Sequence, residues 1–258
     1  MFTLGCDVGS ASSKAVIMKD GKEIIASAVF PFGAGSTGPA AVLKSVFDET
    51  RLKMEDMAFI VATGYGRYNF HDAGAEISEI SCHARGIRFL VPAVRTIIDI
   101  GGQDAKAIRL DEKGMVSQFL MNDKCAAGTG RFLEVMARVL QIGIEELQDY
   151  DARATEIVNV SSTCTVFAES EVISHLASDI PKENIIAGIH AAVASKAGSL
   201  AFRVGVEDDV VMGGGVAQNA GVVRALERQL GHRVIVAPNP QITGAVGAAL
   251  FAYDRAAK

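Results

Sequence analysis

Two short stretches decide the fold: DVGSASSKA at residues 7–15 and DIGGQDAKA at residues 99–107. Each has an aspartate at the end of a predicted strand, then an apolar residue and a glycine, with a lysine seven residues after the aspartate. Each also begins a predicted meander of three strands. One such loop can arise by chance, but two in matching positions indicate a duplicated pair of domains.

The rest of the chain alternates strand patterns with helix patterns. This alternation predicts an α/β protein with several strand-to-helix crossovers, and Asp20-Gly21 predicts a tight hairpin turn in the first meander. The predicted strands cover residues 2–8, 15–18, 23–29, 57–62, 96–101, 105–110, 115–120, 209–215 and 233–237. The predicted helices cover residues 39–50, 76–90, 130–141, 166–178, 183–204, 218–230 and 243–256.

The two loops have the chemistry of an anion site. Glycine has no Cβ, so backbone N–H groups beside Gly9 and Gly101 can approach a phosphate closely. Asp7 and Asp99 can hold Mg²⁺ through water, which this ion prefers to keep. One loop alone fits an ordinary hairpin turn, whereas two facing loops would clamp a triphosphate. The predicted contacts are Gly9, Ser10, Ala11, Ser12, Ser13, Lys14, Gly101, Gly102, Gln103 and Lys106.

A third glycine segment, VMGGGVAQN at residues 211–219, has the pattern of a strand, a turn and a helix start. Its glycines would let a flat ring or its ribose lie against the backbone. The chain has no GxxxxGK[ST] motif and no GxGxxG after a strand, which disfavours P-loop and Rossmann sites. The further predicted nucleotide contacts are Gly128, Thr129, Gly130, Gly213, Gly214, Gly215, Gln218, Asn219 and Gln241.

Gln103 and Asp104 follow the second glycine pair, where either can orient the water that attacks the γ-phosphate. Positioning supplies most of the catalysis in phosphoryl transfer. Gln103 is preferred because it lies nearer the glycines and can both donate and accept a hydrogen bond. A neutral residue there predicts slow hydrolysis, which suits a switch. Together with Asp7 and Asp99, these two residues form the predicted catalytic set.

Composition excludes several classes of protein. The 258 residues are 49% hydrophobic with a formal net charge of −5, which fits a globular chain and excludes a disordered one. The chain contains no block of basic residues, so nucleic-acid binding is not expected. The chain has no run of roughly 18 apolar residues, so a membrane helix is not expected, and the N-terminus lacks a signal-peptide pattern. We therefore expect a cytoplasmic protein without structural disulfides.

Two of the four cysteines have a distinctive setting. Cys125 and Cys164 each precede a predicted helix, and we expect both at helix N-termini, where the macrodipole favours a thiolate. Thiolates suit an iron–sulfur cluster, but two cysteines cannot supply the four ligands of a cubane cluster. The alternative is a pair of ordinary small buried thiols. Cys6 and Cys82 are interpreted as core residues.

The glycine and cysteine segments together resemble a known family. The two Asp-Gly hairpins and the late GGG turn resemble the actin, Hsp70 and sugar-kinase superfamily. Four segments closely resemble activators of 2-hydroxyacyl-CoA dehydratases and the related ATPase subunits of benzoyl-CoA reductase. These segments are ATGYGR (62–67), NDKCAAGTGRF (122–132), SSTCTVFAESEVISHL (161–176) and GGVAQN (214–219).

The resemblance implies an α/β fold of two duplicated actin/Hsp70-like ATPase domains around a nucleotide cleft. The first domain would cover residues 1–94, with the C-terminal helix 243–258 packing back on it, and the second residues 95–242. It further implies one [4Fe-4S] cluster held by Cys125 and Cys164 of both chains of a homodimer. The protein would bind Mg²⁺ and ATP, receive an electron from ferredoxin or flavodoxin, and pass it to a dehydratase component.

Two other functions remain open on the residues alone. A small-molecule kinase of the same fold would use a catalytic carboxylate as base, for which Asp104 is the candidate. A nucleotide-dependent assembly protein would need the nucleotide site but no cluster.

Overall fold

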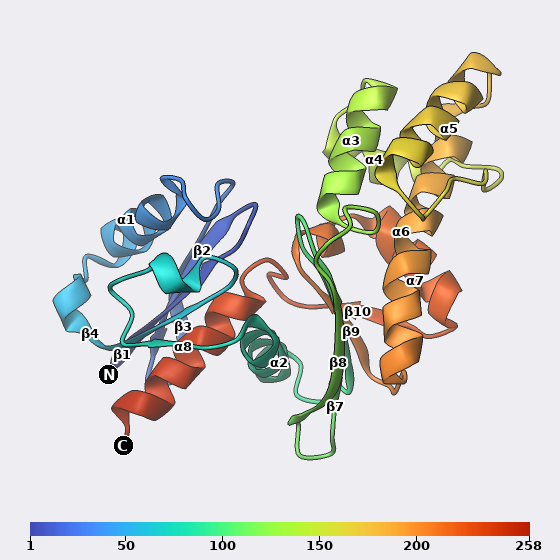
Figure 1. The fold of residues 1–258 in the computed structure, drawn as a ribbon. Coiled ribbons are helices and arrows are strands. Elements are labelled where there is room, and N and C mark those ends of the chain that lie inside the picture. Colours follow the sequence, from blue (N-terminus) through green and yellow to red (C-terminus); the bar gives the residue numbers. More distant parts are fainter. The chain divides into compact units, whose positions relative to one another are not determined.

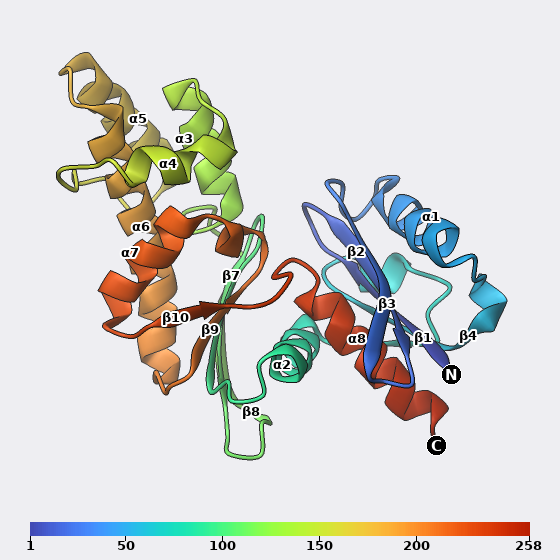
Figure 2. The same cartoon turned by 180° about the vertical axis from the view of Figure 1, so that it is seen from behind.

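The computed structural model describes residues 1–258, which form two compact units. The first unit comprises Met1–Val94, Leu110–Val116 and Ala237–Lys258, and the second comprises Arg95–Arg109 and Ser117–Val236. Each unit contains one five-stranded mixed sheet with helices packed against it (Figures 1 and 2).

The first sheet has the strand order β3-β2-β1-β4-β5, in which β1 pairs with β2 antiparallel and with β4 parallel. Its strands are β1 (Phe2–Val8), β2 (Ser13–Lys19), β3 (Glu23–Phe30), β4 (Met57–Thr63) and β5 (Ala75–Glu76). The predicted Asp20-Gly21 turn is confirmed, since both residues have positive φ, 53° and 62°. Two consecutive positive φ values are those of a type I′ turn, which matches the twist of the strands it joins.

Helices cover both faces of this sheet: α1 (Gly38–Thr50) on one, and α8 (Thr243–Ala256) with α2 (Glu79–Leu90) on the other. Alternation along β2 assigns the faces, because successive side chains of a strand point to opposite sides. Ala15 and Ile17 belong to the α1 side of the core, and Val16 and Met18 to the α8 side. β2 is thus buried on both faces. Its continuous apolar run indicates burial but does not indicate which helix covers which face.

The second sheet has the order β8-β7-β6-β9-β10, which repeats the pairing of the first sheet strand for strand. Its strands are β6 (Thr96–Ile100), β7 (Ala105–Leu110), β8 (Val116–Asn122), β9 (Val210–Gly213) and β10 (Val234–Val236). The helices of this unit are α3 (Gly130–Leu140), α4 (Leu147–Asp151), α5 (Thr165–Ala177), α6 (Lys182–Val204) and α7 (Ala220–Leu230). The predicted α/β class and its two related sheets are confirmed.

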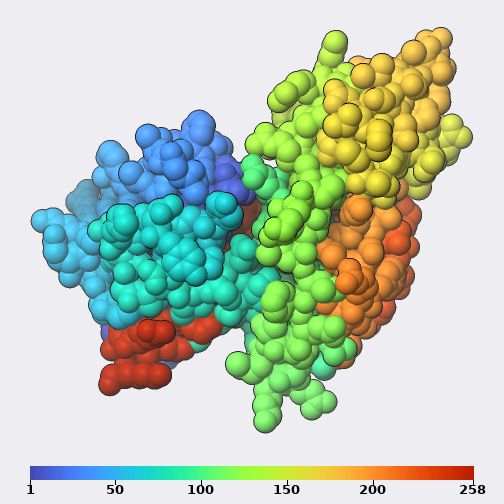
Figure 3. Space-filling view, viewed as in Figure 1, coloured from blue at the N-terminus to red at the C-terminus, as the bar shows by residue number.

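The helices of the second unit hold most of its core. α6 and α7 lie side by side, and α3 and α5 pack against each other. The segment that holds α5, yellow in Figure 3, lies at the surface of this unit. Val172 of α5 is buried, whereas Val166 and Phe167 remain exposed.

The structure also contains elements that the sequence pattern did not predict. α4 is only five residues long, too short for an apolar period, and Gly215–Gln218 forms a 3-10 turn ahead of α7. α7 therefore begins at Ala220 rather than at residue 218, because Asn219 is its N-cap.

One helix, α6, is long and apolar enough to span a membrane by length and composition. Its most apolar stretch is 67% buried inside the protein, as the core helix of a soluble protein would be. Length and composition are weak evidence of membrane insertion for such a helix.

Candidate nucleotide and cluster sites

The first hairpin joins β1 to β2 and presents the first predicted loop. Asp7 and Lys14 face each other in the antiparallel register, and Lys14 Nζ lies 3.3 Å from Asp7 Oδ2. The Gly9 N–H donates to the Ser12 carbonyl at 3.0 Å, which closes the turn. A Cβ on Gly9 would lie 2.9 Å from the Ser12 oxygen and 3.2 Å from Lys14 Nζ. Only glycine therefore fits this tight turn without displacing the Ser12 carbonyl.

The second hairpin, between β6 and β7, repeats this construction. Asp99 faces Lys106 in the register, Lys106 Nζ lies 3.4 Å from Asp99 Oδ2, and the Gly101 N–H donates to the Asp104 carbonyl at 2.9 Å. Lys106 Nζ is also 2.6 Å from Asp104 Oδ2. The Asp104 side chain thus forms an ion pair within its own loop, while Gln103 is exposed to solvent.

Two glycines lie beside the Asp7 carboxylate. Gly64 lies in the left-handed region with φ +86° beside Asp7 Oδ1, and a Cβ on Gly244 would come within 3.1 Å of Asp7 Oδ2. The same Cβ would lie 3.1 Å from His83 Nε2, and His83 Nδ1 is 3.0 Å from Thr243 Oγ1. Gly64 and Gly244 were not among the site residues predicted from the sequence, although Gly64 lies in the ATGYGR segment that carries the family resemblance.

The remaining residues of the first loop divide by exposure. Ser10, Ala11 and Ser12 are partly exposed, so their backbone is accessible to a ligand. Ser13 is buried and its hydroxyl donates to the Phe32 carbonyl at 2.9 Å. Ser13 therefore anchors β2 to the chain segment that follows β3. Gln241, the remaining predicted contact in this unit, is partly buried just before α8.

The GGG turn lies directly beside the second hairpin. Gly213 pairs with Asp99 in parallel register, and Gly214, with φ +81°, is buried against the backbone of Ile100. Gly215 and Gln218 are exposed next to this turn. The Asn219 side chain is used inside the protein, because its Oδ1 accepts from the N–H groups of Gly221 and Val222 at 2.9 and 3.2 Å.

The segment Gly128-Thr129-Gly130 also joins the second hairpin. The Gly130 N–H donates to the Gly101 carbonyl at 2.9 Å, and the Arg131 N–H to the Gly102 carbonyl at 2.8 Å. Thr129 is buried and its hydroxyl donates to the Ala126 carbonyl at 2.7 Å. The N-terminus of α3 is thus fixed to the glycine loop, so the second hairpin, the GGG turn and the loop before α3 converge within one unit.

The two cysteines of the second unit come from segments that meet. Cys125 Sγ lies 3.8 Å from the carbonyl oxygen of Thr163, the residue before Cys164, and both cysteines are partly exposed. Cys164 is the N-cap of α5, as predicted. The prediction for Cys125 is wrong: it lies in the loop after β8, and α3 begins only at Gly130, because the turn through Thr129 intervenes.

The cysteines of the first unit are core residues, as the sequence predicted. Cys6 and Cys82 are fully buried. Burial, the largest influence, raises the pKa of the Cys6 thiol and raises that of Cys82 to about 12. A buried thiol with a raised pKa stays protonated at neutral pH and is a poor metal ligand.

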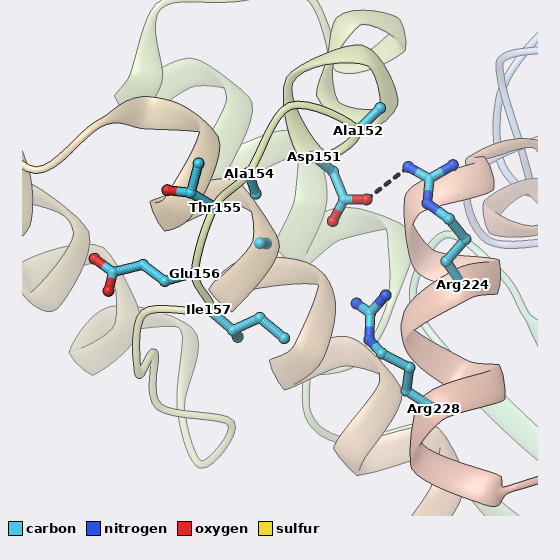
Figure 4. Close-up of a pocket in the computed structure, with 9 residues that line it drawn as sticks. Asp151, Ala152, Ala154, Thr155, Glu156, Ile157, Arg224 and Arg228 are labelled. Atoms are coloured by element: carbon cyan, nitrogen blue, oxygen red, sulfur yellow. Dashed lines mark hydrogen bonds and ion pairs between the residues drawn. The ribbon is translucent and has the colours of Figure 1, made fainter.

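A hollow of about 270 Å³ in the second unit is lined by Asp151, Ala152, residues 154–157, Ala187 and the two arginines of α7 (Figure 4). Asp151 lies at its edge, with Oδ2 2.6 Å from Arg224 Nη2 and Oδ1 3.0 Å from His190 Nδ1. Burial alone would raise the pKa of Asp151, but the hydrogen bonds from His190 and Arg224 outweigh it and lower the pKa. No spacing pattern in the sequence singles out His190.

The sequence model of the BadF/BadG/BcrA/BcrD ATPase family matches residues 4–252 of this chain. The chain belongs to this family. It is 65% identical to the activator of lactoyl-CoA dehydratase from Anaerotignum propionicum, over 100% of both chains. It is 54% identical to the (R)-2-hydroxyglutaryl-CoA dehydratase activating ATPase from Acidaminococcus fermentans, over 100% of this chain and 99% of that protein.

Solved structures agree with this membership of the BadF/BadG/BcrA/BcrD ATPase family. The activator of 2-hydroxyisocaproyl-CoA dehydratase from Clostridium difficile, solved with bound ADPNP, aligns with a TM-score of 0.97 and 54% identity over 100% of this chain and 96% of that one. A ROK family glucokinase from Streptomyces griseus aligns with a TM-score of 0.60 and 13% identity, over 98% of this chain and 100% of that one, which shows a shared fold alone. This chain is an ATPase of the sugar-kinase-like fold, and its predicted ATP binding is confirmed at the level of the family.

Proposed function

We propose that this protein is the ATP-dependent activator of a 2-hydroxyacyl-CoA dehydratase, to which it delivers one electron at a time. The relatives that match the chain over almost its whole length are named as activators of lactoyl-CoA, 2-hydroxyisocaproyl-CoA and (R)-2-hydroxyglutaryl-CoA dehydratases. The observation that carries the proposal is the pair of accessible thiols, Cys125 and Cys164, in the unit that also holds a glycine hairpin.

Cys125 and Cys164 fit half of a cluster site. Their segments lie against each other, both thiols are partly exposed, and the chain brings no third His, Cys, Asp or Glu to them. Next to Cys164, the buried Thr165 Oγ1 has no hydrogen-bond partner, so the start of α5 retains an unused polar atom. Two chains related by a two-fold axis would supply four thiolates for one [4Fe-4S] cluster. We therefore propose a homodimer that holds the cluster between its chains.

A cluster of this kind, when bound, supplies one-electron redox chemistry. The protein's contribution is to hold the thiolates from two separate segments. Cys164 lies at the N-terminus of α5, where the free N–H groups favour negative charge. The loop before α5 is fastened to that helix, since the Ser161 N–H donates to Glu171 Oε2 at 2.6 Å and His175 Nε2 lies 3.0 Å from the Asn159 carbonyl. A movement of α5 would therefore move Cys164 with it.

For the nucleotide, Asp7 and Asp99 would hold Mg²⁺ through water, and the two glycine hairpins would bind the phosphates. The exposed Gly215, at the end of the GGG turn, would accept adenosine. Gln103 is the proposed water-positioning residue, because the Asp104 carboxylate is engaged with Lys106. That engagement also weakens the kinase alternative, which needs Asp104 as a base. No observation favours the assembly-protein alternative.

The proposed partners follow from the same role. The electron donor would be ferredoxin or flavodoxin, the acceptor a dehydratase component, and the place of action the cytoplasm. ATP shifts a conformational equilibrium only if it binds two states with different affinity. We propose that its binding alters the arrangement of the helices that follow the two cysteine segments.

The test is reconstitution without oxygen. Protein purified under nitrogen should be brown, with about two irons per chain. After reduction it should activate a dehydratase component only when Mg-ATP is present, and separate assays with lactoyl-CoA, 2-hydroxyglutaryl-CoA and 2-hydroxyisocaproyl-CoA dehydratases should identify the partner.

Mg-ATP should also speed iron removal by a chelator from the reduced dimer, relative to Mg-ADP. Colourless protein that transfers the γ-phosphoryl group of ATP to a sugar would refute the proposal.

A further inference from the structure

The GGG turn leads into α7 through a side-chain network that is buried inside the second unit. His190, on α6, is fully buried and lies between Asp151 and Asn219. Its Nδ1 is 3.0 Å from Asp151 Oδ1, and its Nε2 is 3.3 Å from Asn219 Nδ2. The imidazole therefore connects the end of α4 with the residue that starts α7.

The geometry fixes the direction of each hydrogen bond. Asn219 Oδ1 accepts from two backbone N–H groups of α7, so its amide nitrogen must be the atom that faces His190. An amide nitrogen only donates, so His190 Nε2 must accept and carry no proton. An ionised Asp151 only accepts, so His190 Nδ1 must carry the proton. Asp151 is held ionised by its ion pair with Arg224 from α7.

Two further features keep this arrangement in place. A Cβ on Gly221 would collide with the imidazole ring, so glycine at this position lets His190 pack against the first turn of α7. Gln148 Oε1 accepts from the Ala220 N–H at 3.1 Å, which ties α4 to the same turn. The exposed residues Gly215 and Gln218 immediately precede this fixed point.

We propose that His190 is a positioning residue for the nucleotide site: as the Nδ1–H tautomer it holds Asn219, and through it the Gly215–Gln218 turn, in the geometry that accepts adenosine. The inference rests on the proposed adenosine site at the GGG turn. His190 does not touch the nucleotide itself. Loss of its bond to Asn219 would free the turn and weaken ATP binding, with little effect on the hydrolytic step.

Two variants of Asn219 separate this role from simple helix capping. Serine and aspartate both cap helices well, so Asn219→Ser and Asn219→Asp should each preserve α7. The shorter serine cannot reach His190, whereas aspartate replaces the amide donor by an acceptor. Asn219→Ser should therefore raise the Kd for Mg-ATP about tenfold at an almost unchanged kcat, the loss expected for one buried hydrogen bond. Asn219→Asp should restore the link with reversed polarity, because an imidazole protonated on both nitrogens can donate to Asp151 and to the new carboxylate, and should keep the Kd within about threefold of the parent.

The spectroscopic test uses ¹⁵N-histidine labelling of the complete protein under nitrogen. The chain has five histidines, and the signal missing from His190→Gln identifies His190. The parent should show a protonated Nδ1 and an unprotonated Nε2, and Asn219→Asp should show both nitrogens protonated. An Nε2–H tautomer in the parent would overturn the proposal, as would an Asn219→Ser variant that binds Mg-ATP like the parent.

Gly215→Val distinguishes failure of the inference from failure of the proposed site. A branched side chain at this exposed glycine should block adenosine and weaken Mg-ATP binding more than Asn219→Ser does. Normal binding by Gly215→Val would refute the adenosine site, and with it the positioning role. Weak binding by Gly215→Val with normal binding by Asn219→Ser would refute the positioning role alone.

Discussion

The two glycine hairpins, β1–β2 and β6–β7, have the same backbone hydrogen-bond pattern and differ in the charge of their loops. In both, an aspartate faces a lysine across the strands at 3.3 or 3.4 Å, and a glycine N–H closes the turn three residues on. The residue that accepts this bond is Ser12 in the first hairpin and Asp104 in the second, where its carboxylate also pairs with Lys106. The glycine turn is thus the same in both copies. The residue at the Ser12 or Asp104 position sets the charge of each loop.

The units also differ in their cysteines. Cys6 and Cys82 of the first unit are buried, and Cys125 and Cys164 of the second are partly exposed. A ligand thiolate needs access and a polar setting, which only the second pair has. The two units have therefore diverged: one keeps the basic fold, and the other carries an added helical segment with partly exposed thiols.

The largest expected effect tests this division of the cysteines. Cys125→Ser or Cys164→Ser should reduce the iron content of the anaerobic protein to near zero, because each removes half of the ligands in a dimer. Cys6→Ser and Cys82→Ser are the matched controls and should retain the iron. Iron analysis of the four variants decides the matter, and a Cys125→Ser protein with full iron would contradict the shared cluster.

The next effect tests the shared half of the hairpin comparison. Asp7→Asn and Asp99→Asn should each lower kcat for Mg-ATP hydrolysis about 100-fold, since each removes a carboxylate that we propose holds Mg²⁺ through water. Asp20→Asn is the control, because Asp20 also follows a strand but lies exposed and pairs with the N-terminus. Steady-state ATPase assays at saturating Mg²⁺ measure the effect. Unchanged rates in both hairpin variants would mean that the loops do not hold Mg-ATP.

A smaller effect tests the charge difference itself. Ser12→Asp gives Lys14 a second carboxylate, as Asp104 does for Lys106, and should weaken ATP binding about tenfold by repelling the triphosphate. Ser12→Asn controls for the change in size and should bind almost normally. Asp104→Ser should tighten binding slightly, by less than about threefold. If Ser12→Asp and Asp104→Ser changed the affinity for ATP by equal and opposite amounts, the two hairpins would contribute equally to phosphate binding.

The smallest effect concerns acid stability of the second unit. The pKa of Asp151 is lowered in the folded state, so its stabilisation is present above its unfolded pKa of about 3.9 and is lost as pH falls through the folded value. Asp151→Asn should cost about 1–2 kcal/mol of unfolding free energy at pH 7, with a smaller difference from the parent at pH 3. Asp149→Asn, at an exposed neighbour, should change neither. Urea titrations at the two pH values measure this dependence.

Much of the fold was predictable because its signals are local. Strand alternation, the Asp20-Gly21 turn and the repeated Asp-Gly-Lys spacing depend on residues near each other in the chain, and each predicted the element that formed. The prediction for Cys125 failed because one intervening turn, closed by the Thr129 hydroxyl, moves the helix start away from the cysteine. Local spacing alone cannot report such a turn.

The sequence by itself determined the α/β class, the duplicated hairpins and which cysteines stand apart. Tertiary structure decided how those parts are used. Ser13, Thr129 and Asn219 carry polar groups suited to a nucleotide, yet their side chains bond to backbone or to buried histidine within the protein. The reason is physical: a buried polar group must find a partner, and that partner is chosen by residues distant in sequence that packing brings into contact. His190 has no motif around it, because its role exists only where α4, α6 and α7 meet.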